Sequence, residues 1–388
     1  MNLGPLLVTG SYQVLLQQID SARAEDDYTG TLSLVVSTPV SGTVVTDGAT
    51  AEPTAQLLGQ GMKYTFTGSQ GQYLSLGLLS SADFGDGLVS NPATAVVLDP
   101  DGAAIAAGGL VVTRRGGTGG GSLVWWFGSG VVNMRPLPVS GTYTVLLLQS
   151  GQAFSDIRSV SMALSSPLTG SLSTSSPAVS PNVQRSGQGL LYSFPCAAGE
   201  YVSGALDAPG GNITAASISV LGANGAPLAS RDMTTVLHGG AAGSYKGSTV
   251  LNAGPLPAAG TCALLVQQTG TGESNTGQLN LRWSPVLIGT LALDAQTGVE
   301  IENSGQGLLY SFDANAGDYR AITVSVDDYI KSATVSVLSP SGSVVATSSL
   351  ATVEMPGSLA NPPTYEGAAL LNVGPLSATG TYKLLVQQ

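Results

Sequence analysis

The chain has 388 residues, of which 10% are charged, and its formal net charge is −11. Ordinary soluble domains carry roughly 25% charged residues, so this protein has few charges with which to solvate its surface. Its four lysines and nine arginines are scattered and form no basic stripe, which excludes the usual classes of nucleic-acid-binding protein. No stretch of about 18 apolar residues runs without glycines and polar breaks, so no membrane span is predicted. We therefore expect a protein that buries much of its surface against copies of itself.

Four copies of one stretch organise the chain. Each contains a segment close to Asn-x-Gly-Pro-Leu, then a segment close to Gly-Thr-Tyr, then an apolar run that ends in polar residues, mostly glutamine. The copies lie at residues 2–18, 133–150, 252–268 and 372–388. The tyrosine position falls at Tyr12, Tyr143, Cys262 and Tyr382, at steps of 131, 119 and 120 residues (143−12, 262−143, 382−262). Repeats of this length indicate tandem modules.

Short runs rich in Val, Leu, Thr, Tyr and Ser alternate with Gly, Pro, Asn and Asp along the whole chain. No helical apolar period persists for three turns, so the fold class predicted is all-β. We expect an N-terminal partial module of terminal strands and three tandem β-sandwich modules of jelly-roll type. Their predicted boundaries are 1–36 for the partial module and 37–165, 166–284 and 285–388 for repeats 1, 2 and 3.

Further motifs recur in the same order within each repeat. Gly-Gln-Gly-x-x-Tyr-x-Phe occupies residues 59–66, 187–194 and 305–312, and a Gly-x-Tyr follows at Tyr73, Tyr201 and Tyr319. A strand and a Gly-containing turn come next, ending at Gly102, Gly225 and Gly342. Glycine accepts positive φ without steric cost, as such turns require.

This order of motifs resembles the bacterial pre-peptidase C-terminal domain and its relatives. Those secreted β-sandwich modules contain a Tyr-x-Phe strand, a Leu-x-Asp/Ser-Pro-x-Gly turn and a Gly-Thr-Tyr strand near the end. The resemblance covers nearly the whole chain, three times, and implies a fold and not an activity. In the family, such modules accompany secreted enzymes or are strung along surface proteins, and some relatives bind calcium or sugars. These repeats are longer and have no consistent acidic cluster.

The parity of the final strand supports a sandwich independently. Tyr382, Leu384 and Val386 share one face, and the equivalent residues of the other copies repeat that pattern. The opposite face is polar except for one leucine, which recurs as Leu15, Leu146, Leu265 and Leu385. Either a loop covers this outward leucine or it packs against a neighbouring module.

Two cysteines occur, both in repeat 2. Cys262 replaces the inward tyrosine, and Cys196 lies two residues after Phe194, on the inward face of its strand. The Cys196 position holds Gly68 and Ala314 in the other repeats, so a large-plus-small pair has become two cysteines. This exchange predicts a disulfide across the core, and hence an oxidising, extracellular setting. The alternative is a pair of buried free thiols.

No constellation of catalytic residues is found, so an enzyme is not expected. His238 is the single histidine, which rules out a multi-histidine metal site within one chain. Asp83 with Asp86, and Asp99 with Asp101, could offer oxygens to Ca²⁺, but the other repeats hold no matching acids. Ordinary turn aspartates are the simpler interpretation, and no cofactor is predicted.

Trp125 and Phe127 flank Trp126, which aligns with the aromatic residues Tyr245 and Tyr365 of the later repeats. The two flanking residues are therefore extra. They form either a platform for a sugar or docking partner, or ordinary strand packing within the module.

The chain begins and stops at the same phase of the repeat. The last module lacks a Thr-Gly-x-Leu-x-Leu strand like 276–281, and residues 29–34 contain such a strand without a sandwich to join. An unfinished sandwich exposes an edge that invites pairing. We therefore expect N-terminal strands to complete the C-terminal module of a neighbouring copy, or the sequence to be a window of one longer repeat polypeptide. The candidate assembly residues are Leu3, Leu6, Tyr12, Val14, Leu16, Leu32 and Leu34.

These observations favour a structural protein at the cell surface, part of a bacterial extracellular fibre, stalk or sheath, whose partner is itself. The alternative is an array of carbohydrate-binding or adhesin modules that bind surface glycans.

Overall fold

The computed structural model describes residues 8–16, 34–57, 59–80, 93–115, 125–149, 159–238, 244–272, 275–356 and 364–388. Every element assigned among these residues is a β-strand, so the all-β prediction is confirmed. The described residues contain no helix that is long and apolar enough to cross a membrane.

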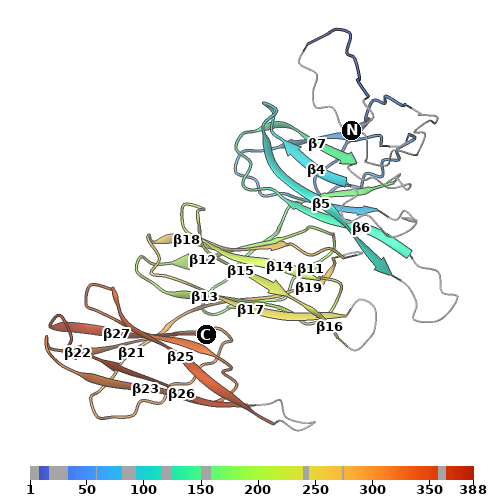
Figure 1. Ribbon diagram of the computed structural model, residues 1–388. Helices are drawn as coiled ribbons and strands as arrows, with labels where there is room; N and C mark the ends of the chain where they lie inside the picture. Colours follow the sequence, from blue (N-terminus) through green and yellow to red (C-terminus); the bar gives the residue numbers. More distant parts are fainter. Residues whose placement is uncertain are drawn as a thin grey trace, which may run out of the picture. The chain divides into compact units, whose positions relative to one another are not determined.

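Each repeat contributes its own strands (Figure 1). Repeat 1 contains β1 (Val40–Thr43), β2 (Met62–Gly68), β3 (Ser75–Ser80), β4 (Ala93–Leu98), β5 (Ala104–Arg115), β6 (Trp125–Asn133), β7 (Gly141–Gln149) and β8 (Ser161–Ser165). Repeat 2 contains β9 (Leu168–Ser171), β10 (Ala178–Val179), β11 (Asn182–Val183), β12 (Leu190–Cys196), β13 (Val202–Ala208), β14 (Ala215–Leu221), β15 (Pro227–Thr234), β16 (Val236–Leu237), β17 (Tyr245–Ala253), β18 (Gly260–Gln268), β19 (Gly277–Gln278) and β20 (Asn280–Pro285). Repeat 3 contains β21 (Leu287–Thr290), β22 (Leu308–Ala314), β23 (Arg320–Asp328), β24 (Ala333–Leu338), β25 (Val344–Met355), β26 (Thr364–Val373) and β27 (Gly380–Gln387).

Repeat 2 is the clearest sandwich. One sheet has the order β15-β14-β18-β12-β9 and the other has the order β10-β20-β13-β17-β16. Alternate residues of both sheets point into one shared core, for example Phe194 and Leu264 from the first sheet and Leu206 and Leu281 from the second. Two sheets that close over one apolar layer in this way define a β-sandwich.

Repeats 1 and 3 join their two layers through one long strand. The first part of β5 pairs with β4 and the last part pairs with β6. In the same way β25 pairs first with β24 and then with β26. In repeat 2 the strand is interrupted at Thr235, whose hydroxyl donates to the carbonyls of Ile213 and Thr214. A hydroxyl that competes for backbone acceptors gives the chain an alternative to the sheet ladder.

The glutamine that closes the organising stretch has a structural partner in the Gly-Gln-Gly motif. The side chain of Gln268 accepts a hydrogen bond from the backbone N–H of Gly187 and donates one to the carbonyl of Gln188, at 3.0 Å each. Gln388 repeats both bonds with Gly305 and Gln306, at 3.0 and 3.3 Å. Each repeat therefore ties its last strand to the turn that opens its Tyr-x-Phe strand.

The chain divides into two compact units, residues 1–165 and 166–388. The first unit holds the core of repeat 1, and the second unit holds the cores of repeats 2 and 3, each a separate cluster of buried residues. A fourth, smaller cluster joins residues of repeat 2 to residues of repeat 3. The border between the units coincides with the predicted end of repeat 1.

Candidate assembly interface

The last strand of repeat 2 completes its second layer. β20 pairs with β13 along one edge and with β10 along the other. It and the preceding residue carry Leu279, Leu281 and Trp283 into the core, where each is at most 2% exposed. In repeat 1, β8 pairs with β3 in the corresponding register, since Ser75 faces Ser165 as Ser203 faces Ser284.

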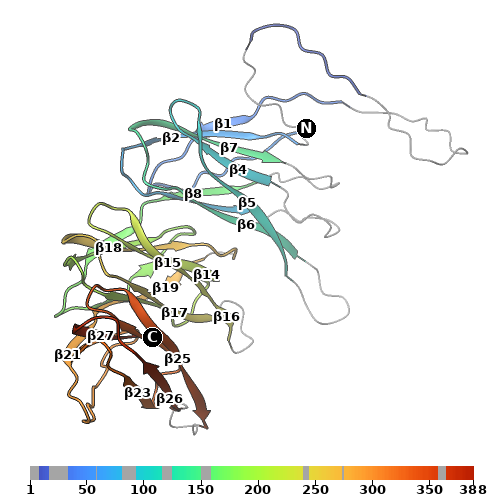
Figure 2. The same ribbon diagram turned by 60° about the vertical axis from the view of Figure 1, so that its left-hand side comes forward.

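Repeat 3 lacks this strand within the described part of the chain. β23 corresponds to β13 and β3, and it pairs with β26 along one edge. Among the described residues no strand pairs with its second edge, so β23 is the edge strand of its sheet. Figure 2 shows β23 and β26 side by side in this layer. The sequence pattern predicted that repeat 3 is one strand short, and this stays a prediction; among the described residues the sheet order ends at β23.

The open edge changes the burial of the core beneath it. Ile322, Val324 and Val326 point inward from β23, yet they are half-buried and pack at the margin of the repeat 3 core. The corresponding inward residue of repeat 2, Leu206, is 1% exposed. A missing strand leaves both an unpaired row of backbone groups and a partly wetted apolar row, which is the combination that promotes pairing with another strand.

Repeat 3 contacts repeat 2 through a small apolar cluster. Leu309, Leu338 and Leu385, which we call the leading face of repeat 3, form a buried cluster with Tyr201 and Val286. Leu385 is one of the outward leucines of the final strand, so for this copy the contact is with a neighbouring module. Tyr201 is 8% exposed, and burial raises the pKa of its phenol.

Polar contacts border this cluster. The side-chain amide of Asn252 donates to the carbonyl of Gln388 at 2.6 Å, and Arg282 donates to the side chain of Asn303 at 3.4 Å. A Cβ placed on Gly305 would lie 2.8 Å from Val250, and the φ of Gly305 is +82°. Both facts require glycine there. Tyr201, Val250 and Asn252 are called the trailing face of repeat 2.

The trailing face of repeat 3 has the same residue types in a different environment. Tyr319 and Leu370 occupy the positions of Tyr201 and Val250, and they are 70% and 60% exposed. Asn372, at the position of Asn252, is also exposed. The Gly-x-Tyr motif marked these tyrosines in the sequence, but the motif did not reveal that they lie at a module junction.

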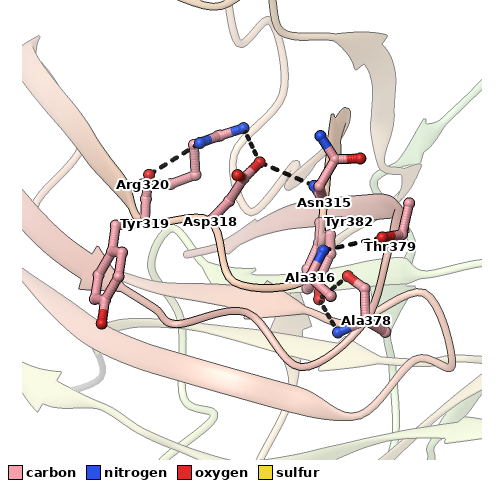
Figure 3. A network of polar contacts seen from close by, with 8 residues as sticks. All are labelled: Asn315, Ala316, Asp318, Tyr319, Arg320, Ala378, Thr379 and Tyr382. Carbon is pink, nitrogen blue, oxygen red and sulfur yellow. Dashed lines mark hydrogen bonds and ion pairs between the residues drawn. The ribbon is translucent and has the colours of Figure 1, made fainter.

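Tyr319 is held out by an ordered turn. The carboxylate of Asp318 accepts from the backbone N–H of Asn315 at 2.9 Å and forms an ion pair with Arg320 at 2.5 Å. The N–H of Asn315 and the Arg320 guanidinium hold the pKa of Asp318 below its ordinary value. Figure 3 shows the Tyr319 ring projecting away from this network. In repeat 2, Glu200 accepts from the N–H of Ala197 in the same way.

The structure joins Cys196 and Cys262 in a disulfide, with Cα atoms 5.8 Å apart and a sequence separation of 66. In the other repeats the tyrosine at the Cys262 position stacks on the phenylalanine of the Tyr-x-Phe strand, as Tyr143 does on Phe66 at 5.2 Å. In repeat 2 the stacking partner of Phe194 is instead Trp283, at 5.1 Å. The disulfide and Trp283 together occupy the space that a tyrosine fills elsewhere.

The predicted N-terminal assembly residues divide into two groups. Tyr12, Val14, Leu16 and Leu34 are described and are all exposed, between 53% and 69%. The hydroxyl of Tyr12 donates to the carbonyl of Val8, as that of Tyr143 donates to the carbonyl of Val139. This local hydrogen bond therefore forms at Tyr12 even though its side chain is exposed. Leu3, Leu6 and Leu32 lie outside the described residues.

The remaining candidate residues lie in β6, in turns and outside the described residues. Trp125 and Phe127 lie in β6, and their side chains lie outside what the structure describes. Asp99 caps its own turn, since its carboxylate accepts from the N–H groups of Asp101 and Ala103. Asp83 and Asp86 lie outside the described residues, and among the residues that are described no group of three or more acidic, histidine or cysteine side chains could hold a metal. His238 is exposed.

Comparisons with known proteins give little to add to this geometry. No family model and no curated protein matches the chain. A solved structure of the CUB1-EGF-CUB2 domain of human MASP-1/3 is similar at 10% identity, covering 61% of this chain and 99% of that one, with a TM-score of 0.15. A likeness this weak supports no conclusion about fold or function.

Proposed function

We propose that this protein is a structural component of an extracellular assembly, built from tandem β-sandwich repeats that join end to end. In this assembly residues 29–37 of one copy pair with β23 of another copy, along the edge that has no partner among the described residues. The open edge of β23, with its half-buried inward residues, carries the proposal. The low charge of the chain and the disulfide of repeat 2 favour a self-associating protein in an oxidising compartment.

The register of the added strand follows from repeat 2. Ser284 faces Ser203 and Leu281 faces Leu206. Transferred to repeat 3, this register places Ser37 opposite Ala321, and Leu34 opposite Val324. Leu32, Leu34 and Val36 would then point inward at the places taken by Leu279, Leu281 and Trp283. Fully burying each aliphatic side chain contributes about 1.5–3 kcal/mol.

A cysteine pair tests this register. Opposite residues of antiparallel strands have Cα atoms about 4.5–5.5 Å apart, which lies within the range for a disulfide. We expect the S37C/A321C variant to form disulfide-linked multimers on a non-reducing gel. The control S37C/S325C shifts one cysteine by four residues and should not crosslink. Equal crosslinking of both variants, none in either, or a bond formed within one chain would contradict the proposal.

A further inference from the structure

Completing repeat 3 with a strand from another copy has a consequence for the module that follows that strand. Leu287, where β21 begins and repeat 3 docks, is the third residue after Ser284 of repeat 2. Ser37 and Val40, where β1 begins, have the same separation. A strand added in the register of β20 therefore brings repeat 1 of the second copy to the trailing face of repeat 3.

We propose that Tyr319 and Leu370 of one copy form a docking surface for the leading face of repeat 1 in a second copy. The inference rests on the proposed strand completion and adds a second, separate contact to it. Continuity with the junction inside the chain identifies the occupant. Where a following repeat is present, Tyr201 is 8% exposed, whereas Tyr319, at the same position in repeat 3, is 70% exposed.

The leading face of repeat 1 fits this role at two of its three positions. Leu98 and Leu146 correspond to Leu338 and Leu385 by their places in β4 and β7, and both are half-buried. Lys63 stands at the position of Leu309 and is exposed. A lysine can lay its aliphatic stem on an apolar surface and keep its ammonium in water. Lys63 therefore permits the contact, but it contributes less apolar contact than a leucine would.

The residues of the polar border also have counterparts in repeats 3 and 1. Asn372 on repeat 3 corresponds to Asn252, whose amide donates to the carbonyl of Gln388. Gln149 closes the last strand of repeat 1 as Gln388 closes that of repeat 3, and its amide donates to the carbonyl of Gln60 at 3.1 Å.

Surface variants test the docking contact in the full chain. We expect Y319S/L370S to weaken self-association about tenfold or more, since a buried tyrosine at the centre of a contact is among the most costly residues to truncate. The matched control is Y329S, because Tyr329 is 59% exposed and lies beyond the other end of β23. K63L should strengthen association, because it restores the leucine of the internal junction.

Sedimentation velocity over a range of protein concentrations measures these effects, and the S37C/A321C crosslink is followed in parallel. If Y319S/L370S associates as tightly as Y329S while the crosslink still forms, the docking surface is wrong and strand completion stands. If the wild-type chain stays monomeric and no crosslink forms, both proposals fail. Weakened association in Y319S/L370S together with tighter association in K63L supports the docking surface.

Discussion

Tyr201 and Tyr319 show how one residue position acquires two roles. Each follows a Gly-x step and a turn capped by an acidic side chain, Glu200 or Asp318. The local structure is therefore the same, and only the covering module differs. Tyr201 is buried beneath the leading face of repeat 3, and its pKa is raised for that reason.

The raised pKa of Tyr201 predicts a loss of stability at alkaline pH. Tyr201 holds its phenolic proton more tightly in the folded protein than in the unfolded chain, where its pKa is near 10.0. This contribution is fully present below the unfolded value and is lost as the pH rises through the folded pKa. Chemical denaturation between neutral pH and about pH 11 should show a smaller loss for Y201F than for the wild type. The control Y319F should behave like the wild type, and equal losses in both variants would contradict the prediction.

Gln268 contributes to the stability of repeat 2 through its hydrogen bonds. It is fully buried, and it accepts from Gly187 and donates to the carbonyls of Gln188 and Arg185. Replacing it with alanine leaves buried backbone groups without partners, which costs about 1–3 kcal/mol. We expect Q268A to lower the free energy of unfolding by that amount in urea titration. The neighbouring variant Q267A, at a half-buried position, should change it by less than about 0.5 kcal/mol, and similar effects for the two would refute the assignment.

At the scale of the element, the strand pair β12 and β18 solves one packing problem differently from its equivalents. In repeat 3, Ala314 and Tyr382 fill the space that Cys196 and Cys262 bridge in repeat 2. Trp283 then stacks on Phe194, where repeat 1 has Leu164 on the equivalent strand. The three substitutions therefore form one coupled set.

This coupling predicts a non-additive mutational series. Removing the disulfide in C196A/C262A should cost about 2–4 kcal/mol, given the length of the loop it closes. C196A/C262Y alone should be no better, because the new ring would compete with Trp283 for the face of Phe194. Adding W283L restores the arrangement of the other repeats and should recover stability in thermal unfolding. A triple variant no more stable than C196A/C262A would show that the positions are independent.

At the scale of the whole molecule, the second layers of the three repeats differ in completeness. Repeats 1 and 2 each have a strand on the outer edge of β3 or β13, whereas β23 has a partner on one edge only among the described residues. Local stability follows the number of buried contacts and paired strands around an element. Repeat 3 should therefore open more readily than repeat 2.

Hydrogen exchange on the dilute chain tests this difference. We expect the amides of β23 to exchange faster than those of β13, and a synthetic peptide of residues 29–37 to slow the exchange of β23 specifically. A peptide carrying Asp in place of Leu34 is the control, because burying an unpaired charge against Val324 is unfavourable. Protection of β23 equal to that of β13 in the dilute chain without peptide would contradict an open edge.

Several features followed from local patterns in the sequence. Alternating apolar residues and glycine-containing turns predicted the all-β fold, because side chains alternate between the faces of a strand. The exchange of a tyrosine and a small residue for Cys262 and Cys196 predicted the disulfide, but the bond joins the neighbouring strands β12 and β18 of one sheet and does not cross the core. The Thr-Gly-x-Leu-x-Leu motif at 276–281 likewise marked the strand that pairs with β13 in repeat 2.

The tertiary structure decided what those patterns left open. The outward leucine of the final strand had two interpretations, and for Leu385 the contact with Tyr201 selects packing against a neighbouring module. The hydrogen bond between Gln268 and Gly187, 81 residues apart, could not be predicted. The final glutamine and the Gly-Gln-Gly motif both recur in the repeats, but neither pattern indicates that the two are in contact. Tyr201 and Tyr319 have the same local sequence pattern and opposite exposure, since burial depends on what covers a residue and not on its neighbours along the chain.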